Sequence, residues 1–306
     1  MQTETEKKTG AKTQALAYAA IIFVVFVWGA SPPINVYLYG GYSAAICSAT
    51  MALVSAVSLL FICLPHLKKL DKDHFKIAGI TGLFNALAAI SQKIGLQYTT
   101  PTKYAFLENL SCVLVPILLF ILIKKKPSFL TVLAALLCLA SSFILSGDMS
   151  GSFGIGEWLC AVSGLLYGVN IAVTGIYAKK LYAPLYVMIQ MWISAIVGFS
   201  TAIILHVTQI EPISFTWEPQ YLLVAVALAL VSSTLCWIIR TNVMKYINPS
   251  AVAVIMPFSA VVAGVISVAF GIDQPTVHLV VGALVGLVAA ILSGVADTLE
   301  KKKEKA

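Results

Sequence analysis

Long apolar stretches, separated by short polar segments, run along the whole chain. Each holds about 20 residues, the length an α-helix needs to cross the hydrocarbon core of a bilayer. The pattern predicts ten spanning helices, at residues 15–38, 42–64, 75–97, 102–123, 128–147, 155–177, 184–207, 219–244, 249–271 and 277–297. No connection is long enough for a soluble domain. We therefore expect an all-α membrane protein.

The second half of the chain repeats the first. Pro101 matches Pro249 at an offset of 148, and after a one-residue slip 144–147 matches 291–294. Five spans per copy is an odd number, so the copies must be inverted relative to each other, an arrangement typical of transporters with a site near the membrane middle. The predicted units are a cytoplasmic tail over 1–14, repeats over 15–147 and 148–297, and a cytoplasmic tail over 298–306.

Only 11% of the residues are charged, and the net charge is +7. The lysines gather at the termini and at alternate connections, which argues against a nucleic-acid partner. They are Lys7, Lys8, Lys12, Lys68, Lys69, Lys72, Lys76, Lys124, Lys125, Lys126, Lys179, Lys180, Lys245, Lys301, Lys302, Lys303 and Lys305. The other connections carry Lys103, Asp148, Glu211, Glu218 and Asp273. The positive-inside bias then places both termini in the cytoplasm, with phospholipid binding by these lysines as an alternative.

Motifs for other chemistry are absent from the sequence. There is no Walker A sequence, no HExxH and no GxSxG. The six cysteines all fall inside predicted spans without metal-ligand spacing, and we interpret them as small buried hydrophobes. We expect no catalytic residues, no metal site and no cofactor.

Three charged residues lie inside predicted spans, where they are costly and usually face the bundle interior. Lys93 in the third span and Glu108 in the fourth are at similar depth, so they are candidate partners. Arg240 lies near the cytoplasmic end of the eighth. The repeat offset maps Gln92 onto Arg240. Lys93 and Arg240 could alternatively reach the membrane surface with their long side chains.

Polar residues share one helical face in five spans, at positions such as i, i+3, i+4 and i+7. Spans two, five, seven and ten show no comparable stripe. We predict that spans one, three, four, six and eight surround a polar cavity, with prolines at 32, 33, 116 and 257 as hinges or static kinks. The predicted substrate-binding residues are Trp28, Asn35, Asn85, Gln92, Lys93, Tyr104, Glu108, Tyr167, Asn170, Trp237 and Arg240.

Several short motifs resemble those of one transporter family. The stretches 27–31 (VWGAS) and 166–170 (LYGVN) resemble the aromatic-Gly starts of its two repeats, and 95–101 and 244–249 resemble the junctions of the third and fourth helices in each repeat. On these grounds the chain is identified as a member of the drug/metabolite transporter superfamily, EamA type. The connection 124–127 (KKKP) departs from the acidic residue that often follows the fourth helix in that family.

The resemblance implies export of amino acids or related small polar metabolites by alternating access, from a bacterial inner or plasma membrane. Lys93 or Arg240 would hold a carboxylate and Glu108 an amine, while Trp28, Tyr167 and Trp237 contact an apolar body. Coupling to protons through Glu108 and facilitated diffusion both remain open, as does the oligomeric state. The alternatives are an antiporter of nucleotide sugars or sugar phosphates, and a membrane-embedded protein without transport activity.

Overall fold

The computed structural model describes residues 4–99, 104, 107–146, 154–269 and 276–305, which fold into helices and turns without strands. The long helices are α1 (Glu4–Leu38), α2 (Ala44–Cys63), α3 (Lys72–Tyr98), α5 (Ser111–Ile123), α6 (Phe129–Ser146), α7 (Ile155–Tyr177), α8 (Ala183–Val207), α9 (Pro219–Leu228), α10 (Cys236–Val243), α11 (Pro249–Ile255), α12 (Phe258–Ala269) and α13 (Val277–Lys305). Short helical segments cover η1 (Leu64–Lys69), η2 (Ala178–Lys180) and η3 (Ala229–Leu235). Lys103, Asp148 and Asp273 lie outside the described residues.

The predicted fold class is confirmed. Eight helices within the described ranges are long and apolar enough to cross a membrane, and Ser111–Ile123 and Phe129–Leu145 are shorter apolar helices. The eighth span is α9, a π-helical segment (η3) and α10 in series, and the ninth is α11 and α12, which are separated at Pro257. Both predicted tails are largely helical, because α1 begins at Glu4 and α13 continues to Lys305.

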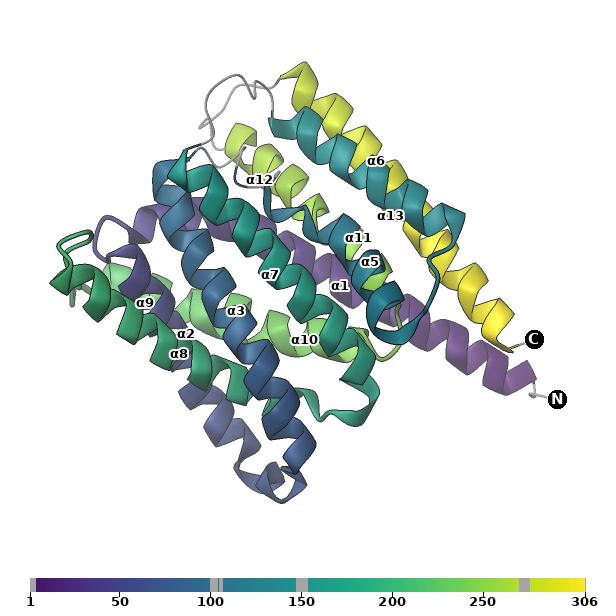
Figure 1. Cartoon of the computed structure of the whole chain (residues 1–306), viewed down its shortest axis with the longest axis horizontal. Coiled ribbons are helices and arrows are strands. Elements are labelled where there is room, and N and C mark those ends of the chain that lie inside the picture. The colour runs from purple at the N-terminus through teal and green to yellow at the C-terminus, as the bar shows by residue number, and fades with distance from the viewer. Residues whose placement is uncertain (1–3, 100–103, 105–106, 147–153, 270–275, 306) are drawn as a thin grey trace.

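Helices of one repeat pack mainly against helices of the other. The closest pairs are α6 with α13, α3 with α7, and α2 with α8, and α1 packs on α12 as α5 packs on α7. Figure 1 shows α6 and α13 side by side at one edge of the bundle, with the two chain ends close together. We call the face of the bundle at which α1 begins and α13 ends the termini face.

At the termini face, a histidine ties the two repeats together. The backbone N–H of Tyr182 donates to Nε2 of His74 at 3.0 Å, so the Nδ1 atom carries the proton and donates to Asp71 at 2.7 Å. Asp71 also caps α3 by accepting from the His74 backbone N–H at 2.8 Å. These hydrogen bonds hold the pKa of the Asp71 carboxyl below its ordinary value.

At the opposite face, the corresponding connections meet in a similar way. Glu211 Oε1 accepts from the backbone N–H of Ala44 at 2.9 Å and from Gln97 Nε2 at 3.0 Å. The Ser43 backbone N–H donates to the Ser214 carbonyl at 3.0 Å. Each face of the bundle therefore carries polar contacts between the repeats, built from different side chains.

Close packing of α7 positions the start of the fourth span. A Cβ atom on Gly164 would lie 2.5 Å from the Leu107 carbonyl oxygen and 2.9 Å from the Glu108 Cα atom. Only glycine allows these backbones to approach so closely, as small residues do at helix interfaces in membranes. Gly79, in contrast, has no atom within 4 Å of such a Cβ.

We expect the substitution Gly164→Ala to lower the melting temperature of the detergent-solubilised protein by several degrees, because the added methyl group must displace backbone. Gly79→Ala is the matched control and should leave the melting temperature unchanged or raise it, since alanine favours the helix by about 1 kcal/mol. Equal melting temperatures for the two variants would contradict the close approach of α7 to Glu108.

Candidate functional site

Four of the predicted residues form one cluster around the Glu108 carboxylate. Gln92 Nε2 donates to Glu108 Oε1 at 2.9 Å and also contacts the Tyr104 hydroxyl, and Tyr167 donates to Gln92 Oε1 at 3.2 Å. Tyr104 is buried, while the other three side chains are half-buried. We call these four residues the acidic cluster. Its carboxylate has hydrogen bonds from neutral groups and no cationic partner within the described part of the chain.

The predicted pairing of Lys93 with Glu108 is wrong. Lys93 Nζ donates instead to Asn35 Oδ1 at 2.9 Å and lies 3.9 Å from the Met51 sulfur. The reason is the helical geometry of α3: Gln92 and Lys93 are consecutive, so they point about 100° apart. Gln92 reaches Glu108, and Lys93 turns toward α1 and α2.

Arg240 lies deep in the bundle with an exposed fraction of 2%. Its Nη2 atom donates to Asn170 Oδ1 at 2.9 Å, and its Cζ atom lies 4.5 Å from the centroid of the Trp237 ring. Asn170 is held in turn by donating to the Thr81 carbonyl at 3.0 Å. The Nε atom of Arg240 is buried without a partner, and none of the ion pairs among the described residues involves this guanidinium.

Aromatic rings connect the acidic cluster to Arg240. The ring centroids of Tyr167 and Trp237 are 6.3 Å apart, and those of Trp28 and Trp237 are 5.6 Å apart. Contacts therefore run from Glu108 through Gln92, Tyr167 and Trp237 to the guanidinium. The site so assembled has a carboxylate at one end, a guanidinium at the other and an aromatic wall between them.

Trp28 is anchored by an irregular stretch of the eighth span. Its Nε1 atom donates to the Ser232 carbonyl at 3.1 Å, within the π-helical segment. The Thr234 hydroxyl donates to the Ala229 carbonyl in the same segment at 2.9 Å. Such π-helical segments occur frequently at functional sites because they free backbone groups. The sequence predicted an ordinary helix here, since no proline marks the irregularity.

The predicted absence of a polar stripe in span seven is also wrong. On α8, Tyr186, Gln190 and Ser194 follow one another at four-residue spacing, and all are buried. Tyr186 and Gln190 bond the Thr81 hydroxyl, at 2.7 and 2.8 Å, and Ser194 accepts from Asn85 at 3.1 Å. Asn85 therefore serves the α3–α8 contact. The i, i+4, i+8 spacing was the signal that could have identified these residues.

No group of three or more metal-ligating side chains occurs among the residues that the structure describes. The charged groups here suit an organic ligand that carries both an ammonium group and an anionic group, with charge-assisted hydrogen bonds to each.

Comparison with known proteins identifies relatives over nearly the whole chain. Residues 15–147 and 154–295 each match the sequence model of the EamA-like transporter family. An uncharacterized transporter of Archaeoglobus fulgidus is 28% identical over 293 residues, which span 94% of this chain and 89% of that protein. A solved crystal structure shares the fold with a TM-score of 0.74 at 15% identity, covering 93% of this chain and 98% of that one.

We expect Arg240→Gln to raise the melting temperature of the ligand-free protein, because it removes a buried charge without a counter-anion while keeping a donor for Asn170. Arg240→Lys keeps the charge and should not stabilise. The measurement is thermal unfolding in detergent. A large loss of stability in Arg240→Gln would show that the guanidinium serves the fold rather than a ligand.

Proposed function

The chain belongs to the EamA-like transporter family, and we propose that it moves small zwitterionic metabolites, amino acids first among them, outward across the membrane. The observation that carries this proposal is the separation of Glu108 from Arg240 by an aromatic wall, with neither charge paired to an opposite charge among the residues that the structure describes. Family membership makes it an integral membrane transporter of small molecules, and the charge pattern favours the substrate class.

A zwitterion would supply the charges that the site lacks. Its ammonium group would bind the carboxylate of Glu108, its carboxylate would bind the free side of the Arg240 guanidinium, and its apolar part would lie against Trp28 and Trp237. Each charge-assisted hydrogen bond contributes about 1.5–3 kcal/mol. Binding relieves the cost of two poorly compensated charges, so it favours a closed, occupied state.

Alternating access follows from the inverted repeats, which can rock about a central site. Proton coupling fits the same geometry, since a proton could occupy Glu108 when substrate leaves. The lysine-rich connections at the termini face favour a cytoplasmic location for both termini in a bacterial inner or plasma membrane.

A sugar phosphate or nucleotide sugar is the second candidate, because Arg240 has no carboxylate partner among the described residues and could hold a phosphate. Glu108 disfavours it, since a half-buried carboxylate in the same site would repel a doubly charged anion. Counterflow in liposomes containing the purified protein separates the two, with amino acids, polyamines, organic cations and phosphorylated sugars as the panel. We expect saturable exchange of amino acids; exchange of phosphorylated sugars alone would reject the proposal.

Removing the charge at one end of the site should impair the transport of different substrate analogues from removing the charge at the other end. We expect Glu108→Gln and Arg240→Gln each to reduce amino-acid counterflow about 10- to 100-fold, equivalent to roughly 1.4–2.8 kcal/mol. Glu108→Gln should spare transported analogues that lack the amine, and Arg240→Gln those that lack the carboxylate. Glu218→Gln, an exposed change of the same kind at the opposite face, is the control. Unchanged rates in both site variants would contradict these roles.

A further inference from the structure

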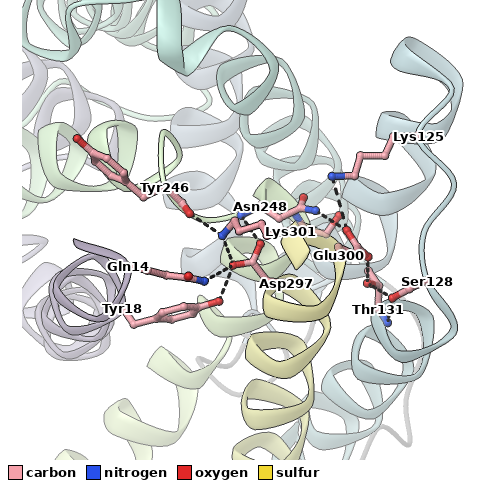
Figure 2. A network of polar contacts seen from close by, with 11 residues as sticks. Gln14, Tyr18, Lys125, Ser128, Thr131, Tyr246, Asn248, Asp297, Glu300 and Lys301 are labelled. Carbon is pink, nitrogen blue, oxygen red and sulfur yellow. Dashed lines mark hydrogen bonds and ion pairs between the residues drawn. The ribbon is translucent and has the colours of Figure 1, made fainter. Parts of the chain in front are cut away.

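The α13 carboxylate Asp297 lies at the centre of a polar network at the termini face, shown in Figure 2. Its side chain is only 1% exposed. Its Oδ2 atom accepts from the Tyr18 hydroxyl at 2.8 Å and from Gln14 Nε2 at 3.2 Å. Asp297 therefore fixes the N-terminal half of α1 to α13.

The same carboxylate also binds the turn between α10 and α11. Its Oδ1 atom accepts from the backbone N–H of Asn248 at 3.0 Å. Lys301, one helical turn further on α13, forms an ion pair with Asp297 and donates to the Tyr246 carbonyl at 2.5 Å. Two side chains of α13 thus hold this turn by its backbone, one at the Tyr246 carbonyl and one at the Asn248 N–H.

Glu300 extends the network to the first repeat's α5–α6 connection. It accepts from Asn248 Nδ2 at 2.9 Å and from the Thr131 hydroxyl at 2.8 Å, and it lies 3.6 Å from Lys125 Nζ. We call Asp297, Glu300 and Lys301, with the residues that they bind, the termini-face latch.

The latch acts on the helices that carry the candidate site. Trp28 is on α1, and Trp237 and Arg240 are on α10. The termini-face end of α1 and the turn that follows α10 are both bound to α13 by Asp297. Separation of α1 from the turn after α10 at the termini face, which would open a route toward Arg240, breaks these hydrogen bonds.

The inverted copy has no equivalent of these carboxylates. The match of 144–147 with 291–294 is an offset of 147, which pairs Asp297 with Ser150 and Glu300 with Phe153. Both partners lie outside the described residues, so this comparison rests on sequence alone. The opposite face is held by a carboxylate from a different connection, Glu211, which binds Ala44 and Gln97. Closures built from different groups at the two faces would bias the two packings of an inverted-repeat protein.

We propose that Asp297 and Glu300 form an inner gate that holds the termini face closed and must open in each transport cycle. The inference rests on the proposed transport function. Polar contacts suit this role because water at the membrane surface can replace each hydrogen bond when the gate opens, so the net cost of separation is small. Apolar packing, such as that of Ala135 on α6 and Ala289 on α13 in one buried cluster, offers no such exchange.

Labelling of a cysteine beneath the latch tests the gate without any substrate. Ser250 is 4% exposed and lines a small pocket with Lys125, Asn248 and Glu300. In detergent, Ser250→Cys should react slowly with a hydrophilic maleimide. Adding Asp297→Asn should raise the labelling rate at least tenfold, and Tyr18→Phe should raise it by a smaller factor.

Two controls separate gating from general loosening. The six native cysteines are buried, so their own labelling rate without Ser250→Cys should stay unchanged in Asp297→Asn. Glu211→Gln removes a carboxylate contact at the opposite face and should not accelerate labelling at position 250. If Asp297→Asn fails to fold, Tyr18→Phe and Lys301→Gln carry the test.

The outcomes are distinct. Faster labelling at position 250 alone supports the gate. Labelling at the parent rate in folded variants overturns it, and faster labelling of every cysteine shows a purely structural role and overturns it as well. The labelling assay contains no substrate, so a negative labelling result rejects the gate and says nothing about transport. A positive labelling result together with a negative transport assay rejects only the substrate class.

Discussion

A polar group in the membrane interior needs a hydrogen-bond partner, and this constraint organises the whole bundle. Three polar side chains of α3 find theirs across the boundary between the repeats: Thr81 and Asn85 bond side chains of α8, and Gln92 accepts from Tyr167 of α7. Contact between apolar side chains and lipid would favour every arrangement of the helices about equally. The polar pairs therefore select which helix faces which, and they select the interface of the two repeats as the place for charge.

The same constraint makes Glu108 and Arg240 exceptional. Lys93 is satisfied by Asn35, and Asp297 has partners from three segments of the chain. Within the described ranges, Glu108 and Arg240 have neutral partners only, and one nitrogen of Arg240 has none. A protein selected for stability alone would pair these charges or remove them. Their retention in that form is understandable if a mobile partner of opposite charge completes them, which links the energetics of the fold to transport.

The sequence was sufficient for the architecture because span length and repeat offset depend on residue type alone. The sequence predicted the site less well, because a shift of one residue along a helix turns the side chain by about 100° and so decides which residue it contacts. Lys93 and Gln92 are neighbours in sequence and serve different clusters. The spacing of Gln190 and Tyr186 on one helix was visible in the sequence, but their contact with Thr81 was not, because only tertiary packing fixes how α3 and α8 are rotated relative to each other. The π-helical segment has no sequence marker comparable to a proline.

The two copies have diverged at equivalent positions, and this divergence gives the site its polarity. Gln92 and Arg240 correspond at the offset of 148. In the first repeat, the Gln92 amide donates to the Glu108 carboxylate. In the second, the Arg240 guanidinium donates to the Asn170 amide and has no carboxylate partner among the described residues. Inversion places these residues in opposite halves of the bundle, so a symmetric scaffold acquires a negative end and a positive end. The proposed gate at the termini face and the different Glu211 contact at the opposite face add a second difference between the two states. Under the proposal, a pseudo-symmetric protein would thereby bind its substrate in one orientation and favour one open face.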